Sequence, residues 1–387
     1  MPIKNRIAEL ADEIAAWRHD FHRHPELDYD VHRTASIVAE KLKEFGCDDV
    51  ITGIGRTGVV GIIAGRVQGD RVIGLRADMD ALPIHETTGK PHASTVPGKM
   101  HACGHDGHTA MLLGAAKYLA ETRNFSGKVA VIFQPAEEGG GGGKAMVDDG
   151  MMARFGIAEV YGMHNLPGMP VGQFGTRAGP IMAAADKFEI RIDGRGAHAA
   201  MPHLAIDTVL IGSQLVTMLQ GIVARNVDPL ESAVLSVTTF HAGDAFNVLP
   251  QTATMRGTVR TFNSVVQDLV EQRMRETIAS FAALHGASIH FDYVRGYPVT
   301  RNHERETAYA LESAQRTAGE GRVNQAIAPM MGAEDFSYML DERPGCFIFI
   351  GNGPSAGLHH PDYDFNDAAI PHGVSYWVDL VETRLAR

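Results

Sequence analysis

The sequence predicts an α/β fold in which a domain with a mostly parallel sheet is interrupted by an inserted ferredoxin-like (βαββαβ) domain. The chain has 387 residues, more than one hydrophobic core usually organises, so two domains are expected. Strand-like apolar runs alternate with helical periodicity over residues 1–182 and again over 295–387. Between them, residues 183–294 follow the order β-α-β-β-α-β, which is typical of a ferredoxin-like domain.

The first segment is predicted to begin with helices and to continue with strands. A second helix is predicted over about 34–45, strands over 50–65 and a buried strand over 71–77. A helix is then predicted over 109–123, followed by strands at 128–134 and 158–164. The opening helix, which Pro25 ends, is predicted from apolar residues at helical spacing: Ile7, Leu10, Ile14, Trp17 and Phe21.

The inserted segment and the return to the first domain follow in order. Strands are predicted at 186–194, 232–240, 252–262 and 287–295. Two helices, at about 204–225 and 264–285, complete the insertion. The α/β pattern then resumes with a helix near 304–318, a short helix after Asp335, a strand at 346–353 and a closing helix.

Two glycine-rich stretches resemble nucleotide-binding loops but lack their context. Gly53, Gly55 and Gly58 match G-x-G-x-x-G, a pattern that binds dinucleotides only when a helix follows at once. Here the β-like run VVGIIAGRV follows, so this interpretation is weak. The glycine run 139–143 ends at Lys144, but Ala145 stands where a phosphate loop needs serine or threonine.

Composition excludes several classes of partner. The net charge of −11 and the sequence pI of about 5.9 argue against nucleic acid or an anionic membrane. The amino terminus has no apolar signal core, and we expect no membrane span. The cysteines Cys47, Cys103 and Cys346 are odd in number and far apart, which favours a reducing, cytoplasmic location over a disulfide framework.

Residues 101–108, HACGHDGH, hold the densest group of metal-ligand side chains. On an extended segment, Cys103 and His105 would face the same side because they stand two residues apart. A thiolate and an imidazole that converge on one point suit zinc or a similar transition metal. A lone Cys-x-His is more often a buried cysteine beside surface histidines, so further ligands are needed to support a metal site.

Further candidate ligands follow predicted strands. Because open α/β sheets bind ligands beyond the carboxyl ends of their strands, these residues are expected to converge there: Asp78, Asp80, Glu137, Glu138, His164 and His359. Singly, each has an ordinary explanation as a cap, a solvated loop residue or a core histidine. Together they exceed the needs of one tetrahedral ion and predict two ions with a shared ligand. Of the paired glutamates, one can bind metal while the other deprotonates water.

Nine segments that span nearly the whole chain resemble one known family. The sequence resembles the dinuclear-metal aminoacylase and carboxypeptidase family, and within it the branch of hippurate hydrolases and indole-acetyl-amino-acid hydrolases. The resemblance implies a catalytic domain interrupted by a lid that also forms a homodimer, possibly a higher assembly. The matching segments are HRHPEL, RADMDALPI, HACGHDGH, QPAEEGGGG, GMHNLP, GRGAHAAMPH, NVLPQTATMRGTVRTF, MGAEDFSYM and LHHPDYDFND.

The resemblance also implies residue roles. Glu137 matches the general base, and Asp80 matches a carboxylate that orients a ligand. His198, Asn247 and Arg260 match lid positions that contact substrate, and in the family such residues can reach the site of the partner subunit. The implied ligands of two divalent ions are Cys103, His105, Glu138, His164 and His359.

This chain departs from most branches of the family at two positions. Asp78-Met79-Asp80 stands where most branches carry His-x-Asp, and Cys103 replaces a bridging aspartate; the hippurate branch shares both changes. Asp78 therefore stays open as a ligand. A bridging thiolate favours zinc, cobalt or nickel over magnesium, and we expect Zn, Mn, Co or Ni.

The predicted function is metal-dependent hydrolysis of the amide bond of N-acyl amino acids. Glu137 would deprotonate water, His198 would stabilise the oxyanion, and an arginine would hold the α-carboxylate. Arg256 and Arg260 share one strand face, so either suits the pattern, while the resemblance selects Arg260. The alternatives are a non-catalytic metal-binding protein and, on the glycine match alone, a nicotinamide-dependent oxidoreductase.

Overall fold

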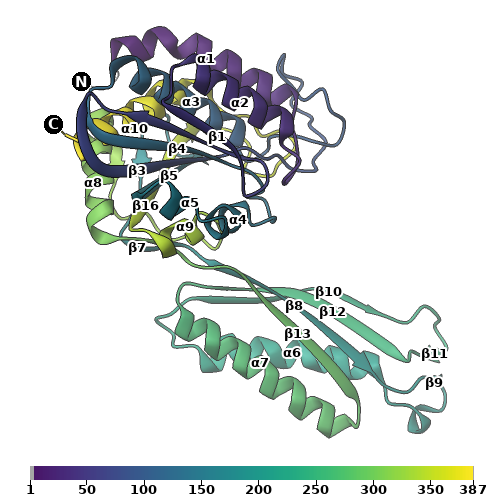
Figure 1. Cartoon of the computed structure of the whole chain (residues 1–387). Helices are drawn as coiled ribbons and strands as arrows, with labels where there is room; N and C mark the ends of the chain where they lie inside the picture. The colour runs from purple at the N-terminus through teal and green to yellow at the C-terminus, as the bar shows by residue number, and fades with distance from the viewer. Residues whose placement is uncertain (1–3, 387) are drawn as a thin grey trace. The chain divides into compact units, whose positions relative to one another are not determined.

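The computed structural model describes residues 4–386 and divides the chain into two compact units (Figure 1). Unit 1 comprises Met1–Ile181, Arg301–Ala328 and Asp335–Arg387. Unit 2 comprises Met182–Thr300 and Pro329–Glu334. The boundary expected at residue 294 falls inside strand β13, which continues to Tyr297.

Unit 1 is built on an eight-stranded sheet with the strand order β1-β2-β4-β3-β5-β16-β6-β15. The pairs β3·β4, β3·β5 and β5·β16 in its centre are parallel, whereas β1·β2, β2·β4 and β6·β16 are antiparallel. The mostly parallel sheet that the sequence predicts is therefore confirmed. The strands are β1 Asp49–Ile54, β2 Gly58–Ala64, β3 Val67–Asp78, β4 Ser126–Gln134, β5 Ile157–Pro167, β6 Phe174–Gly175, β15 Val323–Asn324 and β16 Gly345–Gly353. The short strands β7 Gly179–Met182 and β14 Thr300–Asn302 stand where the chain passes between the units.

Helices cover both faces of this sheet. In Figure 1, α1, α2, α3 and α10 lie over one face, while α4, α5 and α9 lie over the other. The apolar side of α1 is buried in the main hydrophobic core, as its helical spacing predicts. The helices of unit 1 are α1 Asn5–Arg23, α2 His32–Glu44, α3 His105–Thr122, α4 Gly142–Asp148, α5 Met151–Arg154, α8 Glu304–Ala318, α9 Ser337–Glu342 and α10 Ile370–Arg384.

The local structure corrects one expectation and explains one glycine pattern. Cys103 does not lie on an extended segment: it stands in a bend, and α3 begins at His105, four residues earlier than predicted. Gly104, with φ of +91°, makes this sharp turn possible. In the other stretch, Gly53 lies at the irregularity near the end of β1 and Gly55 in the turn that leads to β2, so a strand follows them rather than the helix that a dinucleotide site needs.

Unit 2 has the predicted ferredoxin-like arrangement. Its antiparallel sheet has the order β10-β12-β8-β13, and its chain order is β8-α6-β10-β12-α7-β13. Two short strands, β9 and β11, pair at one end of the unit (Figure 1). The elements are β8 Ala184–Asp193, β9 Ala197–His198, α6 Thr208–Asn226, β10 Ala233–Ala242, β11 Val248–Leu249, β12 Thr252–Thr261, α7 Ser264–His285 and β13 Ser288–Tyr297.

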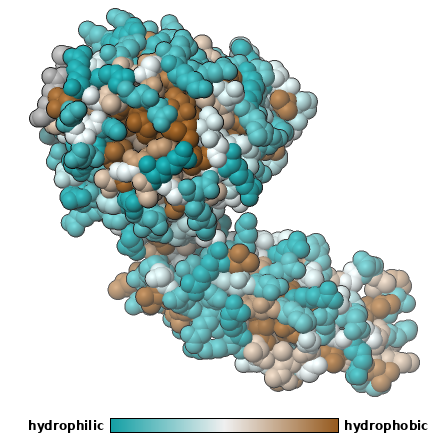
Figure 2. Space-filling model, in the orientation of Figure 1, coloured by the Kyte–Doolittle hydropathy of each residue, from teal (hydrophilic) through white to brown (hydrophobic). Residues whose placement is uncertain are grey.

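Helix α6 is long and apolar enough to cross a membrane by length and composition alone, which the sequence reading did not anticipate. Core helices of soluble proteins pass the same test. One side of α6 packs into the core of unit 2 through Ile211, Leu215, Leu219 and Ile222. Figure 2 shows apolar residues scattered among hydrophilic ones over this unit.

Candidate metal centre

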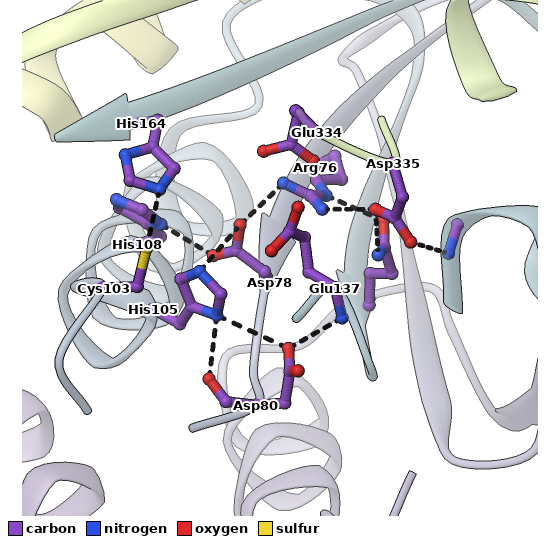
Figure 3. Close-up of polar contacts among 12 residues, drawn as sticks. Arg76, Asp78, Asp80, Cys103, His105, His108, Glu137, His164, Glu334 and Asp335 are labelled. Carbon is purple, nitrogen blue, oxygen red and sulfur yellow. Dashed lines mark hydrogen bonds and ion pairs between the residues drawn. The ribbon is translucent and has the colours of Figure 1, made fainter. Parts of the chain in front are cut away.

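The parallel strands of unit 1 bring the predicted ligands to one place, and Figure 3 shows three of them, Cys103, His105 and His164. His164 lies on β5, Glu138 follows β4, and Cys103 and His105 flank the start of α3. His359 comes from the loop after β16. Because β3, β4, β5 and β16 are parallel, the segments that follow them meet at one edge of the sheet, as predicted.

The five predicted ligands form two groups of three that share one residue. The ligand atoms of Cys103, His105 and His164 lie within 4.8 Å of one another. The ligand atoms of Cys103, Glu138 and His359 also lie within 4.8 Å of one another. A single cysteine sulfur shared by two triads is the arrangement that a dinuclear site with a bridging ligand requires.

Two buried atoms in these triads lack a hydrogen bond. His105 Nε2 and Glu138 Oε1 have no hydrogen-bond partner among residues 4–386, although burial makes an unpaired polar atom costly. They are 3.8 Å apart, and Glu138 Oε1 is 3.3 Å from His359 Nε2. Cys103 Sγ lies 3.4 Å from His164 Nε2. Nitrogen, sulfur and carboxylate donors that converge in this way fit divalent transition metals.

Asp80 orients three parts of the centre. Its carboxylate accepts the backbone N–H of Glu137 at 2.9 Å and that of Glu138 at 3.1 Å. Its backbone oxygen lies 2.8 Å from His105 Nδ1. A carbonyl oxygen can only accept, so His105 Nδ1 donates to it, and Nε2 is the ring nitrogen left to face the triad. These contacts are compatible with the orienting role that the resemblance implies for Asp80, which stays a prediction.

His108 and Asp78 contact each other, and Asp78 Oδ2 also lies 3.7 Å from His105 Nε2. His108 Nδ1 lies 2.7 Å from Asp78 Oδ1, and its Nε2 accepts the backbone N–H of Asn165 at 2.9 Å. The second oxygen of Asp78 is 2.7 Å from Arg76 Nη1. With both oxygens engaged, Asp78 fits a positioning role better than a ligand role.

Charges in the centre favour binding of a cation. Burial lowers the pKa of His105, but Asp78, Asp80 and Glu138 outweigh it and raise that pKa to about 10. Burial raises the pKa of the Cys103 thiol well above its usual value, and nearby carboxylates add to the effect. An ion that binds here must therefore displace protons, which makes its affinity depend on pH.

The predicted substrate residues lie in unit 2, at two different ends of its sheet. His198, on β9, pairs with Val248, and the N–H of Ala199 donates to Asn247 O at 3.0 Å, so His198 and Asn247 are neighbours. Arg260 lies on β12, directly opposite Ala185 of β8.

The distance between these two groups is large for a small substrate. Strand β8 continues from Ala185, opposite Arg260, to Asp193, and β9 begins beyond that end. These eight residue steps correspond to about 27 Å of extended strand. The register therefore separates His198 and Asn247 from Arg260 of the same chain by more than the length of an N-acyl amino acid.

The two candidate arginines differ in their surroundings. Arg256 Nε forms an ion pair with Glu189 at 2.8 Å on an exposed surface. Arg260 is half-buried, bonds only to Thr258 and the Val259 carbonyl, and has no acidic partner in an ion pair among the described residues. Of the two arginines, Arg256 is therefore engaged by an acidic side chain and Arg260 is not.

A buried network of hydrogen bonds and ion pairs beneath the centre was not predicted from the sequence. Arg76 donates to Gln134 at 2.8 Å and pairs with Asp335 at 3.1 Å, besides its contact with Asp78. Asp335 also accepts the backbone N–H of Gly143 at 2.7 Å. An arginine inside an apolar strand was the one signal in the sequence, because a buried charge needs partners.

A model of the peptidase family M20/M25/M40 matches residues 74–383. The chain belongs to this family. It is 41% identical over 374 residues to a hippurate hydrolase of Campylobacter jejuni, with 97% of each chain covered. It is 45% identical over 304 residues to an N-acyl-L-amino acid amidohydrolase of Geobacillus stearothermophilus, covering 78% of this chain and 81% of that protein.

A solved structure from the same family extends the comparison to the fold. A dinuclear metal binding peptidase of the M20 family from Bacillus subtilis superposes with a TM-score of 0.85 at 34% identity. The match covers 98% of this chain and 99% of that one. The family resemblance drawn from the nine sequence segments is therefore confirmed.

Proposed function

We propose that this member of the family is a metal-dependent amidohydrolase that cleaves N-acyl amino acids into a carboxylate and a free amino acid. The observation that carries the proposal is the pair of triads that share Cys103, with Glu137 beside them. The relatives named hippurate hydrolase and N-acyl-L-amino acid amidohydrolase support this substrate class.

Cys103, His105 and His164 would hold one ion, and Cys103, Glu138 and His359 the other. Zinc, cobalt, nickel or manganese suits these sulfur, nitrogen and oxygen donors. Two such ions, when bound, supply Lewis acidity that activates water and polarises the amide carbonyl.

Glu137 would act as general base. It follows β4 next to Glu138, and its backbone N–H is fixed by Asp80 at 2.9 Å. Its ligand atom lies within 4.8 Å of those of Glu138 and His105, so it is close enough to take the proton of a water bound there. Glu137 would then pass this proton to the leaving amine, which completes the hydrolysis.

Arg260 would recognise the α-carboxylate of the substrate. Burial lowers the pKa of its guanidinium, and the nearby Asp186 only partly offsets this effect, so the cation is incompletely compensated within the protein. A carboxylate can accept two parallel hydrogen bonds from the guanidinium fork. This contact would select free acids over esters and amides.

His198 and Asn247 would serve the active site of the partner subunit. Because they lie about 27 Å along the sheet from Arg260, one small substrate cannot contact all three residues of a single chain. We therefore propose a homodimer formed through unit 2, which would act as the lid. His198 of one chain would then stabilise the oxyanion at the centre of the other.

The described cysteines are free, which is consistent with a reducing compartment, and we propose a cytoplasmic location. The proposed function is tested by incubating the purified protein with N-acetyl, N-benzoyl and indole-acetyl amino acids and with added Zn, Mn, Co or Ni. Release of free amino acid that requires metal is expected. Two bound ions without turnover of any substrate would favour a non-catalytic metal protein, and absorbance of a bound nicotinamide would favour an oxidoreductase.

A further inference from the structure

One buried arginine joins two stretches of chain that carry candidate ligands. Arg18 lies on α1, and its side chain is fully buried. Its Nε atom forms an ion pair with Asp106 Oδ2 at 3.0 Å. Its Nη2 atom donates to Asp364 Oδ1 at 2.5 Å and to the carbonyl oxygen of Phe365 at 3.1 Å. Arg18 therefore connects the start of α3 to the loop that follows β16.

The first of these stretches depends on α1 for its position. Asp106 follows His105 in the first turn of α3, and the residue before that turn, Gly104, offers no side chain to cap it. Besides its contact with Arg18, the Asp106 carboxylate is 2.8 Å from His22 Nδ1. Two side chains of α1 thus hold the turn from which the ligand His105 projects.

The second stretch carries a strained ligand. His359 has a φ of +64°, a conformation that residues other than glycine rarely adopt without support. Its own backbone N–H donates a hydrogen bond to the carbonyl oxygen of Ala102 at 2.7 Å. Its side chain is 54% exposed, so packing constrains it little. Five residues further on, Asp364 pairs with the fully buried Arg18 at 2.5 Å and also lies 3.0 Å from His92 Nε2, so this loop is held from α1 at Asp364.

We propose that Arg18 is a positioning residue that holds the His359 loop against the start of α3 and so fixes the spacing of the two metal triads. The inference rests on the proposed dinuclear site. Cys103 belongs to both triads, so a shift between these segments would disturb the triad of Cys103, Glu138 and His359. The other triad keeps support that does not involve Arg18, because His22 Nδ1 also holds Asp106 at 2.8 Å and the backbone oxygen of Asp80 lies 2.8 Å from His105 Nδ1.

The test is metal binding by the full-length protein, measured without substrate. Metal-free wild type, Arg18→Lys and Asp364→Asn are titrated with Zn²⁺ or Co²⁺ by calorimetry, and retained metal is counted after gel filtration. Wild type is expected to bind two ions. Each variant should keep one ion at unchanged affinity and bind the other about tenfold more weakly or worse, as with other residues that orient ligands. Asp364 is partly exposed, so Asp364→Asn carries the test if Arg18→Lys does not fold.

A matched control separates positioning from general stability. Arg384 pairs with the buried Glu159 at 3.1 Å, away from the ligand-bearing loops. Arg384→Lys should lower the Tm of metal-free and metal-loaded protein equally. Arg18→Lys should instead reduce the rise in Tm that metal produces. Because the proposal assigns the loss to the triad of His359, adding Arg18→Lys to His359→Ala should weaken metal binding no further.

Each result has a definite meaning. Two ions bound at wild-type affinity in both variants would overturn the inference, as would equal weakening of both ions. A wild type that binds a single ion would overturn it too, because no second triad would exist to position. A wild type that binds two ions but hydrolyses no N-acyl amino acid would refute the proposed function while leaving the role of Arg18 intact.

Discussion

Mixing two inactive variants tests whether one substrate meets residues from two chains. His198→Ala should remove the proposed oxyanion contact, and Glu137→Gln should remove the base, so each pure dimer is expected to be nearly inactive. In a mixed dimer, the intact Glu137 of one chain meets the intact His198 of the other. Random exchange makes about half of the dimers mixed, each with one working site of two, so about a quarter of wild-type activity should return.

Mixing Arg260→Ala with Glu137→Gln is the contrasting experiment, because it should give no rescue. The strand partner of Arg260, Ala185, lies eight residues before Asp193, the end of β8 beyond which β9 and His198 follow. If His198 serves the centre of the partner subunit, we expect Arg260 to serve the centre of its own chain. Mixing Arg260→Ala with Glu137→Gln should restore no activity, because neither subunit of the mixed dimer would hold both residues.

The assay needs verified mixed dimers. Two affinity tags and tandem purification after subunit exchange isolate them, and release of amino acid from an N-acyl substrate is then compared with that of wild type. Purified mixed dimers should reach about half of wild-type activity with the His198 pair, since one of the two sites is complete. Rescue by both pairs, or by neither, would refute the separation inferred from the β8–β12 register.

Three further predictions follow from single residues. Glu137→Gln should keep metal and fold but lower turnover about 10²–10⁴-fold, measured by kinetics alongside metal analysis; near-normal turnover would exclude the base role. Cys103→Ala should lower the metal content measured by elemental analysis, whereas Cys47→Ala and Cys346→Ala should not. Equal metal content in all three variants would show that Cys103 is not a ligand. Burial lowers the pKa of His22, but acidic neighbours outweigh it and raise that pKa to about 9. His22 should therefore contribute about 3 kcal/mol of stability below pH 6.5, lost as the pH rises through 9. Denaturant unfolding of metal-free wild type and His22→Gln across this range checks the window, and parallel curves would contradict it.

Much of the fold could be predicted because burial leaves periodic traces in the sequence. The alternation in 186–194 and the helical spacing in the first 21 residues matched β8 and α1 because each buries one face. The start of α3 could not be predicted, since Gly104 and the histidines around it have weak helix preference. Tertiary packing fixes that start instead, through the contacts of Asp106 with α1.

The candidate centre was predictable to the level of ligand types but not of their partners. Cys103, Glu138 and His359 stood out because several types of ligand residue recur together, in the segment 101–108 and after predicted strands. The role of Arg18 left no trace, because its partners Asp106 and Asp364 are far apart in sequence and a helix arginine is usually a surface residue. The separation of Arg260 from His198 also needed the strand register, which sequence spacing does not contain.

The position of β16 in the sheet has a consequence for synthesis. This strand pairs with β5 inside the sheet of unit 1, yet the ribosome makes it only after the whole of unit 2. At 5–20 residues per second, β5 waits on the order of ten to forty seconds for its neighbour. Unit 2 can complete its own βαββαβ core during that interval. The emerging chain therefore carries one finished domain beside an apolar, unpaired strand edge, and cellular chaperones would have to shield that edge until translation ends.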